Sequence, residues 1–297
     1  MTRPPEAVVA CLRAAGLVAD APWQPLQGGR CNRLWRVGGR VVKLYRPGGG
    51  VSPLFANAPD AEAAALDYLA GSGLAPPLRG RIETPSGSCL VYDHQPGRAW
   101  RAAPGAVGRV LARLHALRGP QLATDPGGAA RLIRQTRAIL AGCGGAAARW
   151  LAARAPGPGA PPLRRLSLVH GDAVPGNIIS TRAGPVLIDW QSPARGDPCG
   201  DLALFLSPAM QALYRGRPLS AAERARFLGG YGDAATRARY RALAPLLHWR
   251  IAAHCLWRAQ RGTPGYRRAF EFERAALPRP SRAQPPAPPC HSRRRAT

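Results

Sequence analysis

Lysine is almost absent from this chain of 297 residues. Lys43 is the only lysine among 42 basic side chains, and every other one is an arginine. An ammonium group is a compact point charge, whereas a guanidinium group is a broad planar fork, so the two are not interchangeable at a tight site. The single lysine is therefore a candidate functional residue, although by itself it can equally be a solvated residue at a strand edge.

Long apolar runs and paired cysteines are also missing. No stretch approaches the roughly 20 apolar residues that a membrane span needs. The segment that begins with Arg3, Pro4 and Pro5 is a poor signal peptide. The seven cysteines are scattered singly without a C-x-x-C motif, which argues against a disulfide framework or a zinc site. We therefore expect a cytoplasmic protein without a membrane partner.

Acidic residues are few, 16 against 42 basic ones, and the formal net charge is +26. Such a charge permits nonspecific attraction to polyanions. The arginines, however, are spread through every segment, and no nucleic-acid-binding motif accompanies them. The densest cluster, Arg293 to Arg295, belongs to a Pro-rich tail at 277–297 that we expect to be disordered. We expect no dedicated nucleic-acid partner.

Three groups suited to phosphoryl transfer lie in one short stretch. Asp172 follows His170-Gly171 and can accept a proton from an attacking hydroxyl group. Asn177 and Asp189 supply the hard oxygen atoms that Mg²⁺ prefers. The spacing of five residues from Asp172 to Asn177 is that of a kinase catalytic loop, and Asp189 follows where a second metal carboxylate belongs. The stretch predicts a kinase that uses ATP and Mg²⁺, with Asp172 as the catalytic base.

Lys43 and Glu62 complete the predicted nucleotide site. In kinases a glutamate on the helix after the lysine strand pairs with that lysine. Lys43 would then hold the α- and β-phosphates, and Glu62, near the start of a predicted helix at 60–69, would position it; Glu62 can also simply complement the helix dipole. We expect a partly exposed pair, which stabilises a fold only weakly. Gly28 and Gly29 precede Lys43 by one hairpin and can bring backbone amides to a phosphate, although hairpin turns use such glycines routinely.

The chain resembles the aminoglycoside phosphotransferase and choline kinase family, a small-molecule branch of the protein-kinase-like fold. The motifs that carry the resemblance are His170-Gly171-Asp172 with Asn177, Ile188-Asp189-Trp190, Gly196-Asp197-Pro198 and Asp201-Leu202-Ala203. Val174 departs from the pattern, because many members have histidine there. The resemblance implies an α+β fold with two lobes. A small β-rich N-lobe at 1–94 would contain the nucleotide-binding sheet, and a larger, mostly helical C-lobe at 95–276 would contain the catalytic loop and the acceptor-binding helices.

The same resemblance implies supporting roles for further residues. The adenine ring would bind the hinge near Val91 and Asp93, with Asp93 contributing its main chain. His170 would buttress the catalytic loop through hydrogen bonds. Asp201 would hold that loop by accepting hydrogen bonds from its backbone or from His170, and Asp197 would cap a turn.

The predicted acceptor is a small molecule. Trp190-Gln191 stand where protein kinases have phenylalanine and glycine after the metal aspartate, which favours a small-molecule kinase. A polycationic acceptor is a poor electrostatic match, because the acidic residues after Asp201 are only Glu223, Asp233, Glu271 and Glu273. We therefore expect transfer of the γ-phosphate of ATP to a hydroxyl group of a neutral or anionic small molecule. A protein kinase and an inactive kinase-like nucleotide-binding module are the alternatives.

Overall fold

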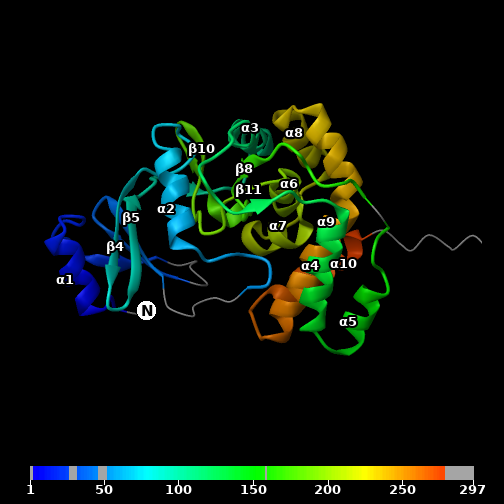
Figure 1. The fold of residues 1–297 in the computed structure, drawn as a ribbon, viewed down its shortest axis with the longest axis horizontal. Coiled ribbons are helices and arrows are strands. Elements are labelled where there is room, and N and C mark those ends of the chain that lie inside the picture. The colour runs from blue at the N-terminus through cyan, green and yellow to red at the C-terminus, as the bar shows by residue number, and fades with distance from the viewer. Residues whose placement is uncertain (1–2, 27–31, 46–51, 158, 278–297) are drawn as a thin grey trace, which may run out of the picture.

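The computed structural model describes residues 3–26, 32–45, 52–157 and 159–277 (Figure 1). The predicted turn at Gly28 and Gly29 lies outside the described residues, as does the predicted tail beyond Leu277. None of the helices in the described ranges is long and apolar enough to cross a membrane.

An antiparallel sheet of five strands forms the N-terminal lobe, on the left in Figure 1, in the order β1-β2-β3-β5-β4. Its strands are β1 (Trp23–Pro25), β2 (Arg33–Val37), β3 (Arg40–Leu44), β4 (Leu78–Thr84) and β5 (Gly87–Asp93). Successive side chains of a strand point to opposite faces. Val42 and Val91 therefore pack with helix α1 (Glu6–Ala14) on one face. Val41 and Tyr92 on the other face belong to the main core, which also includes residues of helix α2 (Pro59–Tyr68).

Helices make up most of the C-terminal lobe, on the right in Figure 1. They are α3 (Pro104–His115), α4 (Ala129–Ala141), α5 (Gly145–Ala152), α6 (Cys199–Leu206), α7 (Pro208–Arg215), α8 (Ala221–Tyr231), α9 (Ala234–Gln260) and α10 (Tyr266–Ala276). Helix α6 is buried almost all round, as expected for an element at the centre of a helical lobe. It therefore lies at the centre of the lobe, and other elements pack around it.

Two small sheets connect this helical core to the cleft between the lobes. One has the order β10-β9-β6 and the other β7-β11-β8. Their strands are β6 (Arg98–Ala99), β7 (Thr124–Asp125), β8 (Ser167–Val169), β9 (Ile178–Thr181), β10 (Gly184–Leu187) and β11 (Ala194–Gly196). Strand β8 ends just before His170, a 3₁₀ turn covers Pro175–Asn177, and the β9–β10 hairpin returns the chain to Asp189. The predicted catalytic stretch is thus a loop and a hairpin that fold back on each other.

Candidate active site

Lys43 is a fully buried cation between two carboxylates. Its Nζ atom lies 2.6 Å from Oε2 of Glu62 on α2 and 2.5 Å from Oδ1 of Asp189. The exposed fraction of the Lys43 side chain is 0% and that of Glu62 is 1%. The hydroxyl group of Tyr45 donates a second hydrogen bond to Glu62. The alternative of a solvated strand-edge lysine is therefore wrong, and so is the expectation of a partly exposed pair.

The charge of Lys43 is stabilised by these partners. Burial by itself lowers the pKa of an ammonium group, because it disfavours the charged form. The attraction of Asp189 and Glu62 outweighs burial and raises the pKa of Lys43 well above its ordinary value. Lys43 is therefore a permanent cation that links the N-terminal lobe to Asp189 in the C-terminal lobe.

Asp172 and Asn177 form a second pair on the opposite side of the cleft. The Asn177 side-chain amide donates to the backbone carbonyl of Asp172 at 2.9 Å and to its carboxylate Oδ2 at 3.0 Å. The Asn177 amide nitrogen is thereby used, which leaves its Oδ1 as an oxygen donor. Gly176 permits this turn, because a Cβ atom there would clash with the ring of Tyr214 on α7. The loop thus holds a carboxylate and an amide oxygen side by side.

Asp172 has the electrostatic character of a general base. Burial raises the pKa of its carboxyl group, and repulsion from Asp189 raises it further, to about 7. The hydrogen bond from Asn177 opposes this shift but does not cancel it. A base whose pKa lies near the working pH combines a usable fraction of the ionised form with a strong affinity for a proton.

Asp201, on the buried helix α6, binds the backbone of the loop that begins at His170. Its two carboxylate oxygens accept the backbone N–H groups of His170 at 2.7 Å and Gly171 at 2.9 Å. The ring of His115 on α3 lies 3.1 Å from the same carboxylate, and the ring's other nitrogen contacts the hydroxyl of Tyr231. Burial favours the neutral acid, but these hydrogen bonds outweigh it and lower the pKa of Asp201 below its ordinary value.

His170 connects the loop that carries Asp172 to the segment that carries Asp189. Its Nδ1 accepts the backbone N–H of Asp172 at 3.2 Å, so its Nε2 carries the proton and donates to the carbonyl of Ile188 at 3.0 Å. Burial lowers the pKa of the ring, which favours this neutral form. The ring also packs against Trp190, with centroids 4.5 Å apart. His170 therefore fixes the position of Asp172 relative to the segment that carries Asp189.

Asp197 lies away from the cleft. One carboxylate oxygen accepts the backbone N–H of Cys199 at 3.0 Å, which caps the turn into α6. The other accepts the guanidinium group of Arg239 on α9 at 2.7 Å. Asp197 thus links the start of α6 to α9.

The assignment of Val91 and Asp93 to the adenine site through their main chain stays a prediction. Strand alternation directs Val91 into the apolar cluster beneath α1, and its neighbour Tyr92 lines the cleft instead. The backbone N–H of Asp93 donates to the carbonyl of Pro77 at 3.0 Å, and the Asp93 carboxylate binds Arg79 at 2.8 Å. The N–H and the carboxylate of Asp93 are therefore already used within the fold.

The interlobe cleft, a space of about 200 Å³, brings the predicted residues together. It is lined by Lys43, Asp172, Asn177 and Asp189, with Glu62 behind Lys43. Asp189 has a φ of 63°, a left-handed conformation that non-glycine residues adopt mainly where the surrounding structure imposes it, often at functional sites. The other residues that line the cleft are Asn32, Leu34, Ser52, Phe55, Tyr92, Gly176, Ile188, Gln191, Met210, Tyr214, Arg258 and Tyr266.

The oxygen donors in the cleft suit a metal ion that is shared with phosphates. The described residues contain no cluster of three histidine, cysteine or acidic side chains able to hold a metal by themselves. Magnesium is usually bound by one or two carboxylates together with substrate phosphates and water. Asp189 and Asn177 fit that requirement, because both line the cleft and both present oxygen atoms.

Comparison with known proteins assigns the chain to a family. Residues 22–243 match the phosphotransferase enzyme family. The chain is a member of that family. No curated protein sequence matches this phosphotransferase.

Solved structures with the same fold include kinases of small molecules. A choline/ethanolamine kinase family protein from Mesorhizobium loti is 17% identical, with a TM-score of 0.59 over 91% of this chain and 95% of the other. A choline kinase from Streptococcus pneumoniae is 16% identical, with a TM-score of 0.59 over 90% and 98%. An aminoglycoside phosphotransferase from Streptomyces rimosus is 20% identical, with a TM-score of 0.52 over 82% and 97%. The predicted family and the predicted α+β kinase-like fold are thus confirmed.

The raised pKa of Asp172 predicts a pH-dependent stability. An unfolded aspartate has a pKa of roughly 3.9, whereas that of Asp172 in the folded phosphotransferase is about 7. Between these values only the unfolded state releases the proton, so the contribution of this group to stability is complete at low pH and is lost as the pH rises through 7. We expect the melting temperature of Asp172→Asn, relative to wild type, to increase from pH 5 to pH 8. Thermal unfolding across this range tests it, and a difference independent of pH would contradict the raised pKa.

Proposed function

We propose that this phosphotransferase transfers the γ-phosphate of ATP to a hydroxyl group of a small molecule and depends on Mg²⁺. The observation that carries the proposal is the gathering of Lys43, Asp172, Asn177 and Asp189 around one cleft. The ligands of related folds support it. The Streptomyces rimosus enzyme has been solved with ADP and streptomycin, and an amicoumacin kinase has been solved with AMP-PNP and Ca²⁺.

The charged residues in and behind the cleft, together with Asn177, each have a role in this proposal. Lys43 binds the α- and β-phosphates, and Glu62 fixes the position of Lys43. Asn177 and Asp189 hold Mg²⁺, which when bound neutralises charge on the phosphate oxygens. Asp172 orients the acceptor hydroxyl and accepts its proton as the oxygen attacks. Because Asn177 donates to Oδ2 of Asp172, the carboxylate is held in one orientation, and Oδ1 is the oxygen that receives the proton.

The acceptor is a neutral or anionic compound. Tyr214, Arg258 and Tyr266 line the C-terminal side of the cleft. Among the described residues that line it, the only carboxylates are Asp172 and Asp189, which already have roles in the reaction. Arg258 adds a positive charge there, and its buried Nε has no hydrogen-bond partner. A polycationic acceptor would meet repulsion from this side chain.

Binding of ATP is predicted to require Mg²⁺ and Asp189. Calorimetric titration of wild type with ATP should give saturable binding in the presence of Mg²⁺ and much weaker binding in EDTA. Asp189→Asn retains the size of the side chain but removes the charge that attracts the metal, so we expect a loss of affinity of about tenfold or more. Equal affinity with and without Mg²⁺ would contradict the proposed metal role.

A coupled assay of ADP release against a panel of hydroxyl-bearing metabolites separates the remaining alternatives. Turnover with a small acceptor supports the proposal. Metal-dependent ATP binding without turnover of any small acceptor or protein supports an inactive nucleotide-binding module, and turnover with protein acceptors alone supports a protein kinase.

A further inference from the structure

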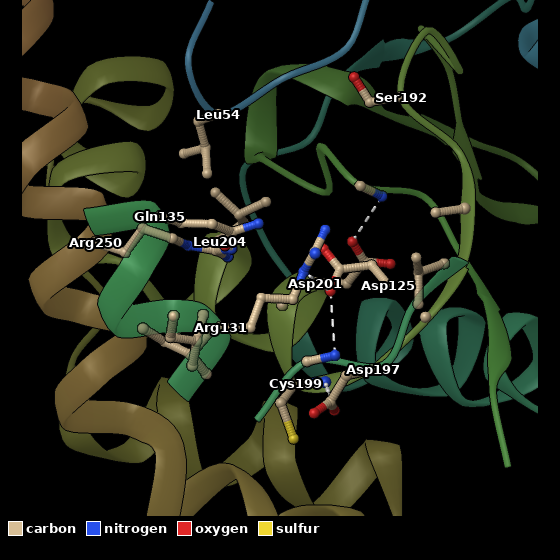
Figure 2. Close-up of a pocket in the computed structure, with 18 of the residues that line it drawn as sticks. Leu54, Asp125, Arg131, Gln135, Ser192, Asp197, Cys199, Asp201, Leu204 and Arg250 are labelled. Carbon is tan, nitrogen blue, oxygen red and sulfur yellow. Dashed lines mark hydrogen bonds and ion pairs between the residues drawn. The ribbon is translucent and has the colours of Figure 1, made fainter. Parts of the chain in front are cut away.

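A second pocket, of about 280 Å³, lies beside the interlobe cleft in the C-terminal lobe (Figure 2). Phe55 lines both spaces, and Gly171, which precedes the catalytic base, lines the second pocket. Its other walls come from α4, α6, α9 and strand β7. The volume is many times the roughly 15 Å³ that admits a single water molecule, so the pocket can accommodate a small ligand.

Arg250 on α9 is the unusual residue of this pocket. Its exposed fraction is 9%, and its Nη1 donates to Oε1 of Gln135 on α4 at 2.8 Å. Its Nε is buried without a hydrogen-bond partner, and no carboxylate among the described residues forms an ion pair with it. Burial lowers the pKa of the guanidinium group, and Asp125 and Asp197 oppose this shift only from a distance. Arg250 is thus a buried cation without a counterion in contact.

Gln135 and Arg131 add further donors from the same face of α4. Because the oxygen of Gln135 accepts from Arg250, its amide nitrogen is oriented as a donor, and it makes no hydrogen bond to the described residues. Arg131 lies one turn earlier, and its Nε is 2.5 Å from Oδ1 of Asp125. The Nη1 and Nη2 atoms of Arg131 make no hydrogen bond or ion pair to the described residues. In Figure 2, Gln135 and Arg250 lie on the left of the pocket and Asp125 on the right.

The three carboxylates that line the pocket, in contrast, each have a partner within the fold. Asp125 binds Arg131 and the backbone N–H of Gly127. Asp197 is engaged by Arg239, and Asp201 accepts the backbone of the catalytic loop. The pocket therefore has unpaired donors on α4 and α9, whereas each carboxylate that lines it in the described part of the chain already binds another group. The complementary ligand must bring acceptor oxygens and negative charge.

We propose that this pocket binds a small oxyanion, a carboxylate or phosphate group, through Arg250, Gln135 and Arg131. A guanidinium group binds such oxygens in pairs, and the Gln135 amide supplies a third donor beside it. The site is distinct from the interlobe cleft. Anion binding there therefore does not depend on the proposed kinase activity. An anion held there lies next to Gly171 and so borders the catalytic loop.

Titration with inorganic phosphate and with malonate tests the proposal and distinguishes the two anion classes. Binding is measured by calorimetry and by the shift in melting temperature, at constant ionic strength with chloride as the reference anion. Wild type should bind at least one of the two saturably, because a ligand that binds only the folded state raises the melting temperature. Arg250→Met should lose about tenfold or more in affinity.

Two further variants keep the test specific. Arg134→Met removes an exposed arginine from the same helix and should bind as wild type does, which controls for the high net charge. Gln135→Glu places a carboxylate next to Arg250, so it should raise the melting temperature without added anion and abolish anion binding. The proposal is overturned if neither phosphate nor malonate binds wild type more tightly than chloride does. It is also overturned if Arg250→Met and Arg134→Met lose anion affinity to the same extent. If Arg250→Met does not fold, unchanged anion binding by Gln135→Glu overturns it.

Discussion

Replacement of Lys43 by arginine is expected to reduce turnover by about 10²-fold or more, although the positive charge is kept. The Nζ atom of Lys43 is enclosed between Glu62 at 2.6 Å and Asp189 at 2.5 Å, and the side chain is 0% exposed. A guanidinium group is wider than this space and cannot reproduce the single-atom contact. It would move Asp189 away from the position proposed for the metal. Steady-state ATP turnover of Lys43→Arg measures the effect.

Lys43→Met is expected to reduce both turnover and stability. With the cation gone, Glu62 and Asp189 face each other across a buried space without compensation. Removal of one partner of a buried ion pair destabilises a fold by about 3–5 kcal/mol. This expected loss of stability replaces the small one that the sequence predicted for a partly exposed pair. Chemical denaturation measures the loss. Arg36→Met, which removes an exposed cation from the neighbouring strand β2, is the matched control and should change neither quantity.

Near-normal turnover in Lys43→Arg, the first of these two variants, would mean that another residue binds the phosphates.

Substitution of Asp172 is expected to separate chemistry from nucleotide binding. Asp172→Asn and Asp172→Ala should lower turnover by about 10²- to 10⁴-fold, because neither side chain can accept the acceptor's proton. The affinity for ATP should remain nearly unchanged, since the role of Asp172 arises only with the hydroxyl group. Calorimetry and turnover on the same preparations test both statements. A variant that lost ATP binding but kept residual turnover would place Asp172 on the metal instead.

The grouping of the candidate residues from His170 to Asp189 could be predicted from sequence because it is local. His170, Asp172, Asn177 and Asp189 lie within one loop and one hairpin, so their spacing along the chain nearly determines their spacing in space. The pairing of Lys43 with Glu62 required more than spacing. It followed from the general pattern of kinases, in which a glutamate on the helix after the lysine strand pairs with that lysine.

Features that depend on long-range packing could not be predicted in this way. Whether Val91 or Tyr92 faces the cleft is a question of strand register, where a shift of one residue exchanges the two faces. His115 supports Asp201 from a helix 86 residues earlier in the chain, and an isolated histidine on an amphipathic helix carries no signal of such a contact. Whether Arg250 has an acidic partner likewise depends on which side chains of α4 pack against α9. In the sequence, nothing distinguishes Arg250 from the 41 other basic residues.

The division of the polar groups between the two lobes has a consequence for nucleotide exchange. Asp172, Asn177 and Asp189 are fastened to one another and to α6 through His170 and Asp201. Lys43 moves with the other lobe and meets this assembly at Asp189. If the proposed function is correct, rotation of the lobes would separate Lys43 from Asp189 and leave Asp172, Asn177 and Asp189 in place relative to one another. A nucleotide would then enter and leave by a hinge motion, and the loop that carries Asp172 would keep its conformation in each cycle.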